Sequence, residues 1–250
     1  MNVNSLSQTN MHRRAQNIKT EIRQEQIARA ALVLIARHGL NHLSIGALAR
    51  EVGVVPSAVY RHYRGKDEVL ESVLDLISRS LLGNVAAVCQ ATPDALERLH
   101  FLLMRHVQLV RHHAGIPRVL FSEEIFAGNS ARRHRAYKTL QGYLDEIAGI
   151  VGKGQQQGQI RADISPDTAA VMFLGLIQPA IILWLMSKGA FDVARHGERA
   201  WCLYCAMLQR GEKQAGSWAA PEHKTKQGNS RPGKREKMKS ACSNEPTHFS

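Results

Sequence analysis

The chain has 250 residues, of which 44% are hydrophobic, enough for one large or two modest domains with a sizeable core. Its formal net charge of +12 favours a polyanionic partner. The four cysteines lack the pattern of a disulfide-rich scaffold and the N-terminus lacks an apolar signal segment, so we expect a cytoplasmic protein. Long segments with helical periodicity dominate, which predicts an all-α fold.

The N-terminal part of the chain is polar at first and basic throughout. We expect residues 1–17 to form a disordered basic arm, which either enters a minor groove or remains a solvated tail. A first helix is predicted over residues 19–38, ended by Gly39. Residues 1–66 contain ten Lys and Arg against three acidic residues. This module is therefore the expected contact with a polyanion.

Residues 43–68 read LSIGALAREVGVVPSAVYRHYRGKDE, which predicts two short helices joined by a turn. Ser44 is a candidate N-cap of the first helix, and Gly53 permits the positive φ that a tight turn needs. Pro56 fits the first turn of the second helix, where a missing N–H is harmless. The pattern predicts a three-helix helix-turn-helix domain over residues 18–65, whose second short helix suits a major groove.

The outer face of that second helix has small or polar side chains followed by a base. We expect Ser57, Ala58 and Arg61 to contact base edges or the groove floor. Hydroxyl and imidazole groups reach phosphate oxygens, and a lysine near a helix start adds its charge to the N-terminal dipole. The predicted DNA-binding residues are Ser44, Ser57, Ala58, Tyr60, Arg61, His62 and Lys66.

The pattern Gly-Val-x-x-x-x-Val-Tyr-x-His-Tyr-x-x-Lys-Asp-Glu over residues 53–68 resembles the DNA-binding signature of TetR-family transcriptional regulators. The resemblance is specific over residues 20–75 and architectural afterwards. It implies backbone contacts for Tyr60, His62 and Lys66. It also implies a core position for Tyr63. The sequence departs from the family at Val55, where a small polar N-cap is common.

Residues 66–210 are expected to form a helical bundle for effector binding and dimerisation. Its helices are predicted at residues 66–82, 93–112, 117–126, 131–157, 166–187 and 192–210. In the family that the motif resembles, an effector sits inside this bundle, which implies a small apolar effector here. The pocket residues implied are Leu99, Leu103, Val107, Phe121, Tyr137, Leu144, Met172, Phe173 and Leu176.

The last two predicted helices are apolar nearly all round and cannot all face one small core. If they pair with the same helices of a second copy as a four-helix bundle, the excess apolar surface is buried. The dimer then has two DNA-binding domains (its two reading heads), one for each of two half-sites about 34–36 Å apart. Residues 169–186 fall short of the ~20 residues that span a bilayer, so we interpret them as a buried helix and expect no membrane contact. The predicted dimer-interface residues are Ile177, Ile181, Leu185, Trp201, Leu203 and Leu208.

Other chemistry-bearing residues form weaker patterns. Cys202-x-x-Cys205 is either a redox or metal pair or, as we favour, two small core residues. His106 and His113 share a helix face but form no recognised ligand set, so no metal site and no cofactor are predicted. Residues 211–250 are expected to form a disordered basic tail that either adds DNA affinity or aids solubility.

Together these features predict a ligand-responsive DNA-binding regulator, most simply a repressor that binds a palindromic operator in double-stranded DNA as a homodimer. Effector binding would swing the helix at residues 66–82 and change the distance between the reading heads. The alternative is a DNA-organising or division-associated protein on the same fold, without a small-molecule effector. The sequence shows no nucleophile with its base, no phosphate loop and no metal set, so we predict that it is not an enzyme.

Overall fold

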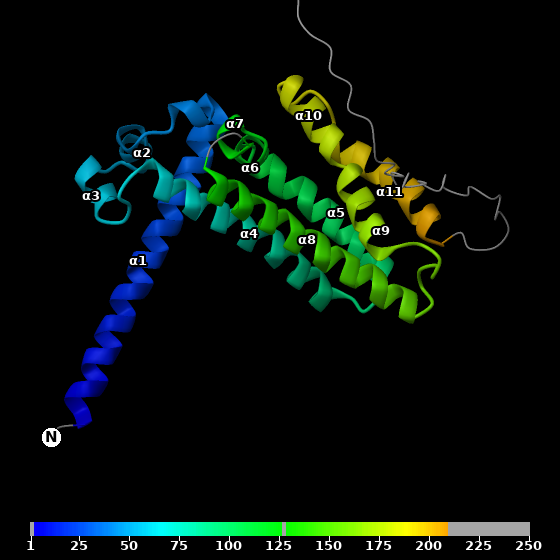
Figure 1. Ribbon diagram of the computed structural model, residues 1–250, viewed down its shortest axis with the longest axis horizontal. Coiled ribbons are helices and arrows are strands. Elements are labelled where there is room, and N and C mark those ends of the chain that lie inside the picture. The colour runs from blue at the N-terminus through cyan, green and yellow to red at the C-terminus, as the bar shows by residue number, and fades with distance from the viewer. Residues whose placement is uncertain (1–2, 127–128, 210–250) are drawn as a thin grey trace, which may run out of the picture. The chain divides into compact units, whose positions relative to one another are not determined.

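The computed structural model describes residues 3–126 and 129–209, with side chains from residue 20 onward. These ranges contain helices and no strand, so the predicted all-α fold is confirmed (Figure 1). The N-terminal helices are α1 (Val3–His38), the 3-10 helix η1 (Leu40–His42), α2 (Ile45–Val52) and α3 (Pro56–Tyr60). The later ones are α4 (Lys66–Ala91), α5 (Ala95–His112), α6 (Gly115–Leu120), α7 (Glu123–Phe126), α8 (Ser130–Gln156), α9 (Pro166–Gly175), α10 (Gln178–Met186) and α11 (Val193–Gln209).

The first helix differs from its prediction at its N-terminal end. α1 begins at Val3, so the expectation of a disordered arm over residues 1–17 is corrected for the residues that the structure describes. Residues 3–38 contain neither glycine nor proline, and nothing in this stretch breaks a helix. The predicted end is confirmed, because Gly39 has a φ of 81° and follows the last helical residue.

The N-terminal helices contribute to a hydrophobic core that continues into the later helices. Ile27, Ala31 and Ile35 on α1 are buried, and α1 packs against α2, α4 and α6. The Tyr63 hydroxyl donates a hydrogen bond of 2.9 Å to the Gln24 carbonyl, and its ring is buried. Tyr63 therefore has the core role that its position in the motif implied.

Helices α4, α5 and α8 lie alongside one another and form the central part of the bundle (Figure 1). The starts of α5 and α8 are capped by polar side chains: Asp94 accepts a hydrogen bond of 2.8 Å from the Glu97 N–H, and Asn129 accepts one from the Ala131 N–H. α4 continues to Ala91, beyond the predicted end at residue 82, because its apolar face continues through Val85 and Val88. The predicted helix 117–126 is two short helices, α6 and α7.

The apolar segment near the C-terminal end is also two helices. The predicted helix 166–187 is interrupted between α9 and α10, just before Pro179, whose missing N–H removes one rung of the hydrogen-bond ladder. By length and hydropathy alone, Lys66–Ala91 and Pro166–Met186 could each cross a membrane. The most apolar part of each segment is buried only in part, 39% in α4 and 33% in Pro166–Met186, so the interpretation of the second segment as a buried helix holds only in part.

Candidate nucleic-acid interface and buried cavity

The turn between α2 and α3 has the geometry that the sequence predicted. The Ser44 side chain accepts a hydrogen bond of 3.1 Å from the Ala47 N–H and caps α2. Gly53 has a φ of 73°, in the left-handed region, and the Val54 N–H donates to the Ala49 carbonyl at 2.9 Å. This is a glycine-terminated helix end, and it directs the chain into α3.

Helix α3 has five residues and is anchored by one fully buried side chain, Val59. Val55 precedes it without a side-chain cap, as its apolar side chain requires, and Pro56 occupies the first turn. The predicted contact residues divide into exposed and half-buried groups. Exposed are Ser44, Ser57, Tyr60 and Arg61; half-buried are Ala58, His62 and Lys66.

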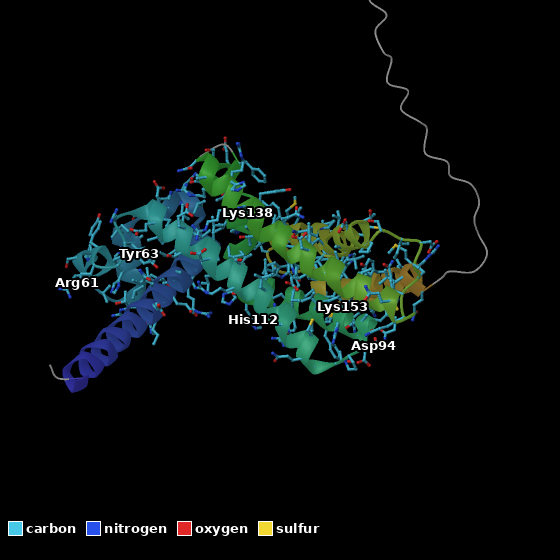
Figure 2. The ribbon with its side chains drawn as sticks, turned by 60° about the horizontal axis from the view of Figure 1, so that its bottom comes forward. Arg61, Tyr63, Asp94, His112, Lys138 and Lys153 are labelled. Carbon is cyan, nitrogen blue, oxygen red and sulfur yellow. The ribbon has the colours of Figure 1, made fainter. Side chains whose placement is uncertain are left out.

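The side chains around α3 point to opposite sides. In Figure 2 Arg61 lies at the outer edge of the N-terminal helices and Tyr63 lies toward their interior. Tyr60 is 57% exposed beside Arg61. An amphipathic phenol and a guanidinium on a short exposed helix match the donors that proteins present to a nucleic-acid groove.

Lys66 begins α4, directly after this surface, and also contacts the bundle. Its ammonium lies 3.6 Å from the Glu124 carboxylate of α7. The Arg64 N–H donates to the Glu68 carboxylate at 2.6 Å, which stabilises the start of α4. His62 holds its backbone carbonyl 3.4 Å from the Gln24 amide nitrogen, so α1 fixes the segment between α3 and α4.

A row of ion pairs joins the first turns of α4 to α8. The buried Arg132 lies 2.7 Å from Asp67 and 3.6 Å from Glu71. Arg135 pairs with Glu71 at 2.9 Å and with Asp75. The sequence contained a signal for this row, because acids at i, i+4 and i+8 share one face of a helix. It was missed because nothing in the sequence identified α8 as the neighbour of that face.

A small, partly open cavity lies between α4, α5, α6, α8 and the α9–α10 junction, and one of its lining residues, Phe121, is 47% exposed. The cavity volume is about 20 Å³, room for about one water molecule. Apolar side chains form most of its wall, and three polar residues, His106, Tyr143 and Gln178, interrupt them. The apolar lining residues are Leu81, Leu109, Val110, Ile116, Pro117, Leu120, Phe121, Leu140, Leu174 and Ile181.

Two of the polar lining residues are hydrogen-bonded to each other. His106 Nδ1 lies 3.2 Å from the Tyr143 hydroxyl, and the two ring centroids are 5.7 Å apart. Burial lowers the pKa of His106 to about 4 and raises the pKa of Tyr143. Both groups are therefore uncharged near neutral pH.

The cavity differs from the pocket that the sequence implied, and Phe121 is the one residue common to both. Leu99, Leu103, Val107 and Phe173 are packed in the core, Leu144 and Leu176 are half-buried, and Tyr137 and Met172 are exposed. The implied set came from the family pattern, in which an effector sits inside the bundle. The cavity instead faces the neighbouring positions on α5 and α8, which include polar His106 and Tyr143. A histidine within the apolar face of α5 was the available signal.

The predicted dimer-interface residues also need correction. Ile177, Ile181 and Leu208 are buried within the protomer and cannot form an intersubunit surface. Leu185 and Trp201 are half-buried, and Leu203 is 77% exposed. Each of these helices turns one apolar face inward and leaves another outward. The outward apolar residues of α9 and α10 are Val171, Met172, Ile182, Leu183 and Met186.

The remaining sequence patterns are placed as follows. Cys202 is exposed on α11, contrary to its interpretation as a core residue, and Cys205 is half-buried. His106 and His113 lie on α5 and at its end, and the described residues contain no group of three or more metal-ligating side chains. The predicted tail at residues 211–250 lies outside the described residues.

Comparison with known families places both halves of the chain. Residues 27–73 match the model of bacterial regulatory proteins, tetR family. Residues 79–206 match the model of the C-terminal region of YsiA-like proteins.

Among curated proteins, the chain is similar to the fatty acid metabolism regulator protein of Bacillus subtilis, with 25% identity over 170 residues, 67% of this chain and 86% of that protein. It is also similar to the nucleoid occlusion factor SlmA of Vibrio cholerae, with 20% identity over 195 residues, 78% of this chain and all of that protein.

Solved structures share the fold. The fatty acid degradation regulator FadR of Bacillus halodurans superposes with a TM-score of 0.64 at 19% identity, covering 75% of this chain and 97% of that one. FadR of Bacillus subtilis, solved with stearoyl-CoA, gives a TM-score of 0.62 at 21% identity, covering 74% and 98%. The relatives named here are regulators or a nucleoid factor rather than enzymes. With both halves of the helical chain matched, the protein belongs to the TetR family of DNA-binding transcriptional regulators.

Proposed function

We propose that this regulator is a cytoplasmic repressor that binds a palindromic operator as a homodimer and releases it when an effector binds. The observation that carries the proposal is the surface of α3. Tyr60 and Arg61 are exposed there, while Val59 and Tyr63 hold the helix from beneath. A rigidly held short helix with exposed donors suits insertion into a major groove.

The homodimer is supported by apolar surface that the protomer leaves uncovered. Leu203 on α11 and Met186 on α10 are each 77% exposed, and Ile182 and Leu183 extend this surface along α10. Large exposed apolar patches mark association sites in soluble proteins. A two-fold axis through this surface would pair two copies of α3, which a palindrome requires.

We propose that the effector carries a fatty acyl chain. The proposal is supported by the apolar lining of the cavity, by a relative named for fatty acid metabolism, and by a related structure solved with stearoyl-CoA. A cavity of about 20 Å³ must widen to admit such a chain. The break between α9 and α10 lies beside Gln178, which lines the cavity, and Pro179 there has no N–H to donate to the helix, so we propose that the cavity widens at this point.

The signal would travel along α4. Leu81 on this helix lines the cavity, and Lys66 at its other end begins directly after the DNA-binding helices. The ion pairs of Arg132 and Arg135 couple the first turns of α4 to α8, another cavity wall. A coupling free energy of about 1–3 kcal/mol changes operator affinity by roughly 5- to 150-fold.

The DNA-binding assignment is tested by combining Tyr60→Ala with Arg61→Ala. Because both side chains are exposed, the variant should fold and keep its sedimentation coefficient, while palindromic operator binding in fluorescence anisotropy is lost. Arg111→Ala, which removes the same charge from the exposed surface of α5, is the matched control and should retain binding. Retained binding by the double variant would show that α3 is not the reading helix.

The similarity to a nucleoid occlusion factor supports a second candidate, a DNA-organising or division-associated protein without a small-molecule effector. The two functions differ in where the protein binds. Genome-wide footprinting should find a few promoter sites for the repressor, and many dispersed sites for the alternative.

A further inference from the structure

The His106–Tyr143 pair keeps one hydrogen-bond donor unused. A neutral imidazole has one N–H and a phenol has one O–H, so the pair has two donors, and their mutual bond uses one of them. If Tyr143 donates to Nδ1, the imidazole Nε2–H remains free. If Nδ1–H donates instead, the phenol O–H remains free. Within the described residues neither ring bonds to any other group.

The walls of the cavity carry no formal charge. The described lining contains no Lys, Arg, Asp or Glu, and His106 is neutral because burial lowers its pKa. A carboxylate moved into such a place would lose its hydration without gaining a counter-charge, which is costly. An uncharged oxygen that accepts a single hydrogen bond fits the one donor that the His106–Tyr143 pair leaves unused, and the Gln178 amide, which also lines the cavity, is uncharged as well.

Building on the proposed function, we infer that His106 and Tyr143 determine effector specificity by donating their one unused hydrogen bond to an uncharged carbonyl oxygen of the effector. The site therefore selects a thioester, ester or ketone, and rejects both the free carboxylate and an analogue in which the carbonyl is a methylene. The charged part of a large effector stays outside the cavity.

The test compares two ligands that differ at one group. Stearoyl-CoA has the thioester carbonyl, whereas octadecyl-CoA, its thioether, has a methylene there and the same chain and charge. Calorimetric titration of the full chain should give about tenfold tighter binding of stearoyl-CoA, the value of about one buried neutral hydrogen bond. Free stearate should bind more weakly than either compound.

The preference should disappear when both polar groups are replaced. Tyr143→Phe combined with His106→Leu removes both donors and should bind the two CoA compounds equally. Tyr204→Phe is the matched control, because its buried hydroxyl donates 2.8 Å to the Ala169 carbonyl and does not line the cavity. This control should keep the tenfold preference. A preference that persists in the double variant would place the donor elsewhere and overturn the inference.

A second measurement needs no variant. In the complex with the wild-type protein, the infrared stretch of stearoyl-CoA labelled at its carbonyl carbon should lie at a lower frequency than in hydrocarbon solvent, because a hydrogen bond weakens the C=O bond. A stretch equal to that in hydrocarbon solvent overturns the inference. Equal affinity for both CoA compounds, with both releasing operator DNA, overturns it while the proposed function stands. If neither compound binds, the acyl effector and the inference are both wrong.

Discussion

Gly115 begins α6 at the point where this short helix meets α1. A Cβ atom at this position would lie 2.3 Å from the Leu32 carbonyl oxygen, a backbone atom that cannot move without displacing α1. We predict that Gly115→Ala lowers the free energy of unfolding by about 1–3 kcal/mol, measured in urea. Gly149→Ala, on an open face of α8, should instead raise it by about 0.5–1 kcal/mol. Similar effects of the two substitutions would contradict the close contact.

The buried imidazole of His106 makes stability depend on pH. Its pKa is about 4 in the folded protein against an ordinary 6.5, so between these values the unfolded chain binds a proton that the folded one does not. The free energy of unfolding should therefore fall by roughly 3 kcal/mol in all as the pH drops through this window. Above about pH 6.5 the protonation of His106 should no longer affect it.

Removing the titrating group tests this directly. His106→Gln should flatten the dependence of unfolding free energy on pH between about 6.5 and 4. The number of protons taken up on unfolding, which sets this slope, should fall by up to one. His112→Gln, at an exposed position of the same helix, should leave the slope unchanged. An unaltered slope in His106→Gln would mean that the buried imidazole takes up its proton without unfolding.

Single residues with a strict backbone or capping requirement could be predicted from the sequence. Ser44 as a cap and Gly53 as a left-handed turn were both correct, because few residue types satisfy those requirements. The cavity residues could not be predicted. Whether an apolar helix position faces a neighbouring helix, a cavity or solvent depends on helix rotation, and a shift of one residue moves a side chain by about 100°. His106 and Tyr143 differ from the predicted positions by that amount.

At the scale of elements, the start of α4 contacts the bundle and follows directly after the helix proposed to bind DNA. Lys66 is close enough to Glu124 for an ion pair, yet a third of its side chain remains exposed. We predict that Lys66→Gln weakens binding to operator and unrelated DNA by the same factor. The slope of log affinity against log salt should fall by about one, as expected for one phosphate contact.

Glu124→Gln is the control for that substitution. It removes the partner and keeps the Lys66 charge, so the salt slope should be unchanged and stability should change by less than about 1 kcal/mol, as for other exposed pairs. If Lys66→Gln left the salt slope unaltered, Lys66 would serve the bundle alone.

Element boundaries were predictable where the sequence interrupts a helix, and less so where it does not. Gln178-Pro179 lies in the middle of the segment predicted as one helix, and the helix is interrupted there although the apolar run continues past it. α1 was predicted too short because a polar composition suggested disorder, although the helix contains neither glycine nor proline. Neighbouring helices set such outcomes as much as local sequence does.

At the scale of the whole molecule, the proposed dimer buries the outward apolar surface of α10 and α11 between its two copies. Only such a dimer would bring two DNA-binding domains to the two half-sites of a palindrome. We predict that Leu203→Lys converts the protein to a monomer in sedimentation. Leu203 is 77% exposed, so the protomer should fold with unchanged helix content, while a lysine buried without a partner would destabilise the dimer.

Loss of the dimer should also lower operator affinity by about 10²-fold or more, because one α3 cannot gain from the second half-site. Tyr137→Lys replaces another exposed aromatic side chain, on α8, and should remain dimeric with full operator affinity. A dimeric Leu203→Lys variant would place the two-fold axis on another surface. A monomeric variant with full operator affinity would show instead that one DNA-binding domain is enough for binding. The proposal that a dimer binds a palindromic operator would then be wrong.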